Sequence, residues 1–275
     1  MASHLLRSAK GLLCDISGVL YDPDGSGGRL IEGSIEAVKR LKDARFPLKF
    51  VTNESQTTRA GLTAKLQHLG FSVTEEDILS PVTAVRAVLK ERNWKAHLLV
   101  HEDCLPELQD VAATAADPVD CVVLGDASDG FSYAALNAAF QRLMTPAARG
   151  GGQPVGLLSL GMGRYYRQAE QLHLDVGAFA RALEFASGST VEVVGKPSAA
   201  FFGAGVKALG LDGAAAVVMV GDDIVSDVGG AMAAGLLGVQ VRTGKFRPSA
   251  DEPHPSVTPT AYVDDLKQLV DILLN

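Results

Sequence analysis

The chain has 275 residues, of which 47% are hydrophobic and 21% are charged, and its formal net charge is −7 at pH 7. This is the composition of an ordinary globular protein, and the length fits one large domain or two modest ones. The negative charge argues against a general nucleic-acid binder, and no apolar run reaches the roughly 18 residues that a membrane span needs.

The cysteines and the first residues bear on the cellular compartment. Three cysteines without a CxxC pair do not make a disulfide framework, and Cys14 and Cys121 lie inside apolar runs, so we expect buried thiols. Residues 1–10 are too few and too polar for a secretory signal. We therefore expect a soluble cytoplasmic protein without a membrane partner, with the nucleus as the alternative location.

The first third of the chain alternates strands with helices. Apolar residues at helical spacing predict a helix over 34–44 with Ser34 as its N-cap, and a second helix over 57–69 that stops at Gly70, a typical C′ glycine. Strand and helix at this spacing indicate βαβ units and a parallel sheet. The other elements expected in this part are strands over 12–14 and 48–51 and a helix over 82–92.

A second α/β pattern begins near Trp94 and interrupts the first. Residues 145–154 are rich in glycine and polar residues, which indicates an exposed loop within this second pattern. The first pattern resumes at Val191, with a strand before Lys196 and another before Asp222. The remaining expected elements are strands over 96–100, 119–124 and 155–160 and helices over 132–144, 175–187 and 264–274.

Four short polar segments follow apolar runs that read as buried parallel strands. Open α/β sheets bind ligands at the carboxyl ends of their strands, so these side chains could meet at one crevice. A carboxylate, a hydroxyl, an ammonium and further carboxylates suit magnesium-assisted phosphoryl transfer through a carboxylate nucleophile. The segments are Asp15-Ile16-Ser17-Gly18-Val19-Leu20-Tyr21, Thr52-Asn53, Lys196-Pro197 and Gly221-Asp222-Asp223, the last followed by Asp227.

These four segments resemble, in order, the four motifs of the haloacid dehalogenase (HAD) superfamily of phosphatases. The resemblance implies a Rossmann-like parallel-sheet core over 1–93 and 191–275, interrupted by a smaller α/β cap domain over 94–190. Five segments are closer still to members that hydrolyse phospholysine, phosphohistidine and inorganic pyrophosphate. They are Asp15 to Asp22, Thr52-Asn53-Glu54-Ser55-Gln56, Gly163-Arg164-Tyr165-Tyr166, Val194-Gly195-Lys196-Pro197-Ser198 and Arg242-Thr243-Gly244-Lys245-Phe246-Arg247-Pro248.

The resemblance implies a Mg²⁺-dependent enzyme in which Asp15 attacks phosphorus and becomes an aspartyl phosphate. Thr52 and Asn53 would hold the phosphoryl oxygens with a hydroxyl and backbone N–H groups, and Lys196 would neutralise charge on the nucleophile and the phosphoryl group. The substrate is then a small phosphorylated molecule or a phosphorylated side chain, and pairing of two chains through their caps is expected.

The same resemblance assigns the metal ligands. Asp15, the backbone carbonyl of Ser17 and Asp222 would bind Mg²⁺, an ion that keeps several waters and needs only one or two protein carboxylates. Asp223 and Asp227 would hold waters or Lys196 around the ion. For Asp223 the alternative is an acidic residue that interacts with a helix dipole.

Arg164 belongs to a segment of the expected cap where related phosphatases carry substrate-choosing residues. Its guanidinium could meet a second phosphate, and the neighbouring tyrosines could stack on an imidazole. Ordinary packing within the cap is the alternative for the segment. We include Arg164 among the candidate substrate-binding residues.

Ser17 departs from the usual pattern of the superfamily. Most of its phosphatases have a second Asp two residues after the nucleophile, which protonates the leaving group and later activates water. Ser17 has no carboxyl group, so that general acid is absent from its usual place and the group that activates water is not identified. A packing choice without bearing on the substrate is the alternative.

Three other functions are compatible with the sequence. The first is a phosphomonoesterase for another small molecule such as pyridoxal phosphate, because only the cap distinguishes close relatives. The second is a phosphotransferase that passes the aspartyl phosphate to another acceptor. The third is a weakly catalytic phosphate-binding regulatory protein, which only the serine at position 17 favours.

The missing general acid gives a first prediction. A general acid contributes about 10²–10⁴-fold to a rate, and it matters most for poor leaving groups such as alkoxides. Ser17→Asp should therefore raise hydrolysis of alkyl phosphates relative to hydrolysis of pyrophosphate, measured as the ratio of the two kcat/KM values. An unchanged ratio would remove the hypothesis that Ser17 biases the enzyme toward P–N and P–O–P bonds.

Overall fold

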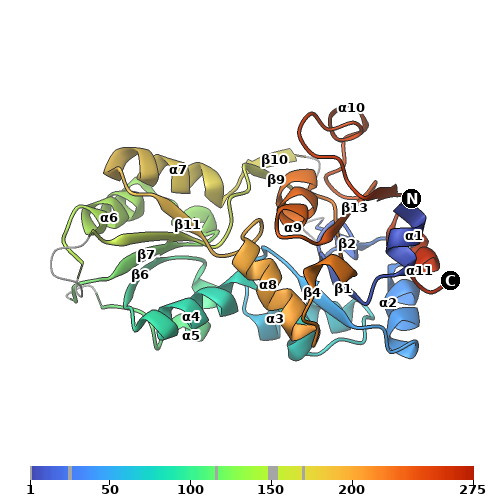
Figure 1. The fold of residues 1–275 in the computed structure, drawn as a ribbon. Helices are drawn as coiled ribbons and strands as arrows, with labels where there is room; N and C mark the ends of the chain where they lie inside the picture. The colour runs from blue at the N-terminus through green and yellow to red at the C-terminus, as the bar shows by residue number, and fades with distance from the viewer. Residues whose placement is uncertain (1, 24–26, 115–116, 148–153, 169–170) are drawn as a thin grey trace.

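The computed structural model describes residues 2–275 except 24–26, 115–116, 148–153 and 169–170. Figure 1 shows two lobes side by side, each built around its own sheet, with both chain termini at the outer end of one lobe. Most of the loop expected over 145–154 lies outside the described residues. Among the described residues, no helix has the length and apolar character to cross a membrane.

The first lobe contains a six-stranded sheet in the order β14-β13-β12-β1-β4-β5. Every neighbouring pair in this sheet is parallel, as the buried apolar runs predicted. The chain moves from β1 to β4 on one side and later returns to β12 on the other, so β1 lies at a topological switch point. The strands are β1 (Gly11–Cys14), β4 (Leu48–Val51), β5 (Ile78–Leu79), β12 (Val217–Gly221), β13 (Leu237–Val241) and β14 (Ala261–Val263).

Helices cover both faces of this sheet because successive strand residues point to opposite sides. Leu12 and Cys14 pack on one face beneath helices α1 (Ala2–Arg7), α2, α3 and α11, while Leu13 packs on the other face beneath α8. The helices of this lobe are α2 (Ser34–Asp43), α3 (Arg59–His68), α8 (Ala199–Ala208), α9 (Gly230–Ala233), α10 (Pro248–Asp251) and α11 (Leu266–Leu273), with a short hairpin of β2 (Tyr21–Asp22) and β3 (Arg29–Leu30).

The second lobe repeats this layered arrangement around a four-stranded parallel sheet in the order β11-β8-β7-β6. Helices α4 and α5 cover one face, and α6 and α7 cover the other. The elements are α4 (Pro81–Arg92), β6 (Ala96–Leu99), α5 (Leu105–Leu108), β7 (Cys121–Leu124), α6 (Tyr133–Leu143), β8 (Gly156–Ser159), α7 (Val176–Ser187) and β11 (Val191–Val193), with an antiparallel hairpin of β9 (Tyr165–Gln168) and β10 (Gln171–Leu174).

Sheet membership corrects the expected edges of the insertion. The strand before Lys196, which we expected in the first sheet from residue 191 onward, is β11, and it pairs with β8 in the second sheet. Helix α4, expected in the core that ends at residue 93, packs its Val82, Val85 and Leu89 against the second sheet. Periodicity identified both elements but could not tell which sheet they join. We therefore propose cap edges near residues 80 and 195.

Two predictions at helix ends had different outcomes. Gly70 has a φ of +101°, and its N–H bonds back to Gln67, so the predicted glycine stop of α3 is confirmed. Ser34 is not an N-cap, because the cap residue is Gly33 and α2 begins at Ser34 itself. The Ser34 hydroxyl instead donates to the buried carbonyl of Leu20 at 2.9 Å, which explains a serine at that position.

Candidate active site

Asp15 lies directly after β1, at the carboxyl edge of the first sheet, and only 7% of it is exposed. Its Oδ1 accepts hydrogen bonds from the backbone N–H of Ile16 at 2.8 Å and from Lys196 Nζ at 2.7 Å. Both bonds are made to one oxygen. The carboxylate is therefore fixed in orientation while its Oδ2 is not engaged by these two donors.

Lys196 is buried between two carboxylates. Its Nζ lies 2.7 Å from Asp15 Oδ1 and 2.8 Å from Asp227 Oδ1, and it also donates to the carbonyl of Val51 at 3.2 Å. Burial by itself would lower the pKa of Lys196, but the charges of Asp15 and Asp227 outweigh it and raise that pKa above its usual value. The side chain is thus a permanent positive charge inside the site.

Asn53 holds the backbone of Lys196 in place. Asn53 Oδ1 accepts from the Lys196 N–H at 2.8 Å, and Asn53 Nδ2 donates to the Lys196 carbonyl at 2.9 Å. Because Lys196 follows β11 of the second sheet and Asn53 follows β4 of the first, this reciprocal pair joins the two lobes. The site therefore lies at the junction of the two lobes.

Asp222 is enclosed by backbone. It follows β12, and Oδ2 accepts from the Lys245 N–H at 2.8 Å. A Cβ built on Gly18 would lie 2.0 Å from this Oδ2, and one built on Gly244 would lie 2.1 Å from it. Both glycines have positive φ, +79° and +63°, so two close backbone approaches fix where the carboxylate sits.

The other oxygen of Asp222, Oδ1, is buried and has no hydrogen-bond partner among the described residues. Burial raises the pKa of Asp222 from its usual value of 3.8 to about 7, although the charge of Lys245 opposes this rise. A buried carboxylate oxygen without a donor is costly in a protein. Asp222 is therefore a group that a cation would stabilise.

Three carboxylates come together at this point. Asp15, Asp222 and Asp227 each place an oxygen so that all three atoms lie within 4.8 Å of one another, and the only ammonium we find paired with them in the described chain is that of Lys196. Burial and the nearby charge of Asp15 raise the pKa of Asp227, with Lys196 acting against them. This excess of negative charge and the oxygen-only donor set fit a hard divalent cation such as Mg²⁺.

Asp223 and Asp227 behave differently from each other. Asp227 pairs with Lys196, in line with one of the roles expected for these two residues, and its Oδ2 accepts from the Asp223 N–H at 3.2 Å. Asp223 does not contact Lys196. Its Oδ1 instead accepts from the N–H groups of Val225 and Ser226 at the start of a π-helical turn, Ile224–Gly229, as the helix-start alternative proposed.

Thr52 and Ser17 lie where the sequence placed them, at the edge of the first sheet. Thr52 is buried at the end of β4, and its Oγ1 accepts from the Glu54 N–H at 2.9 Å, which leaves the hydroxyl hydrogen able to donate. Ser17 is half-buried in the turn after Asp15 and forms a bridge with Tyr21. Their parts in binding remain predictions.

Sequence reasoning gave no role to Lys245 and Gln240. Lys245 binds Asp222 through its N–H and lies 3.3 Å from Asp223 Oδ2 through its Nζ. Together with two backbone N–H groups, Lys245 lowers the pKa of Asp223 against the effect of burial. Gln240, fully buried in β13, donates to the Asp222 carbonyl at 2.8 Å. The resemblance of the segment from Arg242 to Pro248 to known phosphatases could have pointed to Lys245. Nothing in the sequence singles out Gln240.

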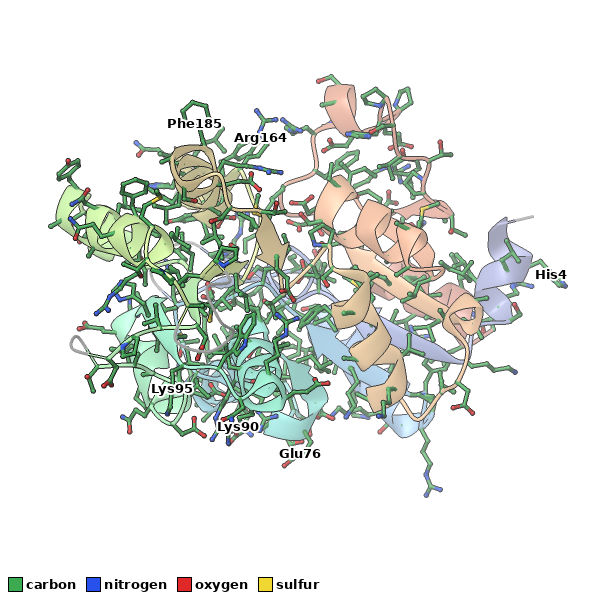
Figure 2. The ribbon with its side chains drawn as sticks, turned by 60° about the vertical axis from the view of Figure 1, so that its left-hand side comes forward. His4, Glu76, Lys90, Lys95, Arg164 and Phe185 are labelled. Carbon is green, nitrogen blue, oxygen red and sulfur yellow. The ribbon has the colours of Figure 1, made fainter. Side chains whose placement is uncertain are left out.

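Arg164 is not among the residues that the structure brings together here. It is exposed just before β9 and lies near the top of the view in Figure 2. The guanidinium that approaches the neighbouring Tyr165 is that of Arg247, from the first lobe, with 6.0 Å between its Cζ and the ring centroid. Tyr166 stacks on the chain's own His173, at 5.4 Å between ring centroids. The role of Arg164 stays a prediction.

Comparison with known proteins identifies relatives along the whole chain. Residues 12–114 match the family described as haloacid dehalogenase-like hydrolase, and residues 193–269 match a second, HAD-hydrolase-like family. The phospholysine phosphohistidine inorganic pyrophosphate phosphatase of Danio rerio is 49% identical over 271 residues, which is 98% of this chain and 96% of that protein.

Solved structures share the fold. The p-nitrophenyl phosphatase from Archaeoglobus fulgidus has a TM-score of 0.82 and 28% identity, over 96% of this chain and 99% of that one. The glycerol phosphate phosphatase from Mycobacterium tuberculosis in complex with magnesium has a TM-score of 0.80 and 23% identity, over 96% of this chain and 77% of that one.

The tight contact between Gly18 and Asp222 leads to a second prediction. Gly18→Ala introduces a methyl group where Asp222 Oδ2 now lies, and the left-handed backbone adds a cost of about 1–2 kcal/mol. We expect a lower melting temperature and loss of the rise in melting temperature that Mg²⁺ gives the wild type. Gly210→Ala is the matched control, because Gly210 has a φ of +74° and nothing within 4 Å of its Cβ position. Equal Mg²⁺ responses in the two variants would contradict the prediction.

The raised pKa of Asp222 leads to a third prediction, for the metal-free protein. Between pH 4 and 7 the folded state keeps a proton on Asp222 that the unfolded chain releases, so this group makes folding less favourable as the pH rises. Asp222→Asn should therefore be more stable than the wild type in EDTA at pH 8, on the order of 2–4 kcal/mol, and by less at pH 5.

Urea unfolding at the two pH values measures this difference. Asp43→Asn is the control, because Asp43 is an exposed carboxylate on α2. If Asp222→Asn is less stable than the wild type at both pH values, the ionised Asp222 carboxylate does not destabilise the folded protein, and the prediction is wrong.

Proposed function

The chain belongs to the haloacid dehalogenase-like hydrolases and is a phosphatase of that family, and we propose that it hydrolyses the P–N bonds of phosphohistidine and phospholysine and the P–O–P bond of inorganic pyrophosphate. The observation that carries the activity is the oriented Asp15 carboxylate, ion-paired with buried Lys196 and beside the unpartnered Oδ1 of Asp222. The substrates named for the Danio rerio relative support the choice of bond.

In the first displacement, Asp15 attacks the phosphorus. Its Oδ1 is held by Ile16 and Lys196, so Oδ2 is the attacking oxygen in our proposal. A bond forms between Oδ2 and phosphorus while the bond from phosphorus to the leaving nitrogen or oxygen breaks, and the leaving group takes the electron pair. A leaving nitrogen also takes a proton from solvent, so that it departs as a neutral amine or imidazole. The product is an aspartyl phosphate on Asp15.

Fixed charges and donors stabilise the transferring phosphoryl group. The ammonium of Lys196 cannot move away, because Asp15, Asp227 and the backbone clamp of Asn53 hold it. The Thr52 hydroxyl, already oriented by the Glu54 N–H, and the backbone N–H of Asn53 are the donors we assign to the phosphoryl oxygens. Because these groups are oriented before the reaction, no free energy is spent on reorienting them when charge develops on the phosphoryl group in the transition state.

The donor set fits Mg²⁺. Asp15, Asp222 and the carbonyl of Ser17 would hold the ion, and the buried Asp222 Oδ1 without a partner is the observation that supports this fit. When bound, Mg²⁺ supplies positive charge that polarises a phosphoryl oxygen. Asp227 is already engaged by Lys196 and by the Asp223 N–H, which supports a place for it around the ion and not on it.

In the second displacement, water cleaves the aspartyl phosphate and restores the Asp15 carboxylate. Ser17 cannot protonate the first leaving group as a carboxylic acid would. A phosphate ion or an imidazole leaves with less help than an alkoxide does, and this supports pyrophosphate and phosphohistidine as substrates over alkyl phosphates. A homodimer and a cytoplasmic location remain predictions from the sequence.

A fourth prediction tests the proposed function directly. Phosphate release is measured from pyrophosphate, a phosphohistidine peptide and pyridoxal phosphate, with Mg²⁺ or with EDTA. We expect release to need Mg²⁺, to favour the first two substrates, and to fall on the order of 10³-fold or more in Asp15→Asn because the nucleophile is lost. Asp43→Asn, an exposed Asp on α2, should keep the wild-type rates.

Two results would contradict the proposal in different ways. Faster release from pyridoxal phosphate than from the other two substrates would keep the phosphatase and overturn the choice of bond. No release above the Asp15→Asn background on any substrate would favour a phosphate-binding protein.

A further inference from the structure

A hollow of about 370 Å³ opens in the second lobe, between β9, β10 and α7 and the short turn Ser128–Gly130. None of the catalytic residues assigned above lines it. Its lining combines aromatic rings with two carboxylates, those of Asp126 and Asp129. Among the described lining residues there is no Lys or Arg.

Two aromatic pairs form the walls of the hollow. Phe131 and Phe179 are stacked, with ring centroids 3.9 Å apart and an angle of 11° between the ring planes. Tyr166 and His173 face each other across the β9–β10 hairpin, at 5.4 Å and 20°. Aromatic faces are electron-rich and attract organic cations, and the attraction is stronger when the cation is partly desolvated.

The two carboxylates have different surroundings. Asp126 is fixed, because its Oδ2 accepts from Gln56 Nε2 at 2.8 Å and its Oδ1 accepts from the Ser128 N–H at 2.9 Å. Asp129 is exposed at the rim. Two negative groups beside aromatic faces would repel a phosphate and attract an ammonium or a guanidinium.

The segment that follows Thr52 is hydrogen-bonded to residues that line the hollow. Gln56 bonds to Asp126 and to Ser128, and the Ser55 Oγ accepts from the Asp126 N–H at 3.0 Å. Ser55 and Gln56 are thus bonded to the rim of the hollow a few residues beyond the Thr52 hydroxyl. The segment from Thr52 to Gln56 therefore connects the active site with the rim of the hollow.

We propose that this hollow binds a cationic side chain, a lysine or an arginine, that neighbours the phosphorylated residue of a peptide substrate. The inference rests on the proposed function, because it assumes that phosphorylated side chains are substrates. Pyrophosphate carries no cation and does not use the hollow. The chain would thus prefer phosphorylated residues in basic segments.

The kinetic test uses two phosphohistidine peptides that differ only in flanking residues, lysine in one and glycine in the other, with pyrophosphate as the reference. We expect the wild type to favour the lysine peptide by about tenfold in kcat/KM, the scale of a partly desolvated cation–π contact. Asp129→Asn and Tyr166→Leu should remove most of this preference and leave pyrophosphate hydrolysis unchanged.

Matched variants separate this role from a structural one. Tyr166→Phe keeps the aromatic face and should keep the preference. Glu91→Gln removes an exposed carboxylate on α4, outside the hollow, and should also keep it. Equal kcat/KM values for the two peptides in the wild type would overturn the inference while leaving the proposed function intact.

A binding measurement covers the case in which the peptides are not hydrolysed at all, which would contradict the proposed function for P–N bonds. Saturation-transfer NMR follows butylguanidinium with the intact wild-type protein. Saturation that is lost in Asp129→Asn and in Tyr166→Leu, but not in Glu91→Gln, supports the cation site independently of catalysis. No saturation in the wild type, or equal saturation in all variants, would overturn it.

Discussion

The buried ammonium of Lys196 is the interaction on which the rest of the site depends. It pairs with Asp15 and Asp227 at 2.7 and 2.8 Å and so offsets part of the repulsion between two buried carboxylates. Removing one partner of such a buried pair lowers the free energy of unfolding by about 3–5 kcal/mol, so the three groups depend on one another. Because Asn53 clamps the Lys196 backbone from the other lobe, the same interaction also fixes how the two sheets meet.

The single ammonium of Lys196 cannot balance the negative charge of three carboxylates. Asp222 lies next to this pair with a buried oxygen that finds no donor, and close approaches by Gly18 and Gly244 prevent the carboxylate from turning away. Lys245 compensates in part, through its N–H to Asp222 and its ammonium near Asp223. The remaining negative charge is what a divalent cation would balance, so the protein without metal keeps an electrostatic imbalance inside an otherwise well-packed core.

In our proposal, the first lobe carries out the reaction and the second lobe selects the substrate. The first lobe supplies Asp15, Asp222 and Asp227, Lys196 lies at the junction directly after β11, and we propose that the second lobe meets the leaving group. Tyr166, in the same segment as Arg164, stacks on His173 and lines a hollow with carboxylates, while the role of Arg164 in substrate choice stays a prediction. In our proposal, selection by this lobe involves the aromatic and acidic groups that line this hollow.

The sequence by itself predicted most of the longer helices and strands and placed the candidate reacting groups at strand ends, because these patterns are local. Apolar runs of strand length, a glycine stop such as Gly70, and Asp15 and Asp222 at strand ends need no knowledge of distant partners. Only the tertiary structure decided which sheet β11 joins and which side of the boundary α4 lies on, because a short apolar run fits either sheet equally well. It also decided that Lys245 and Gln240 hold Asp222, since those contacts join residues 18 to 23 positions apart that no sequence period relates.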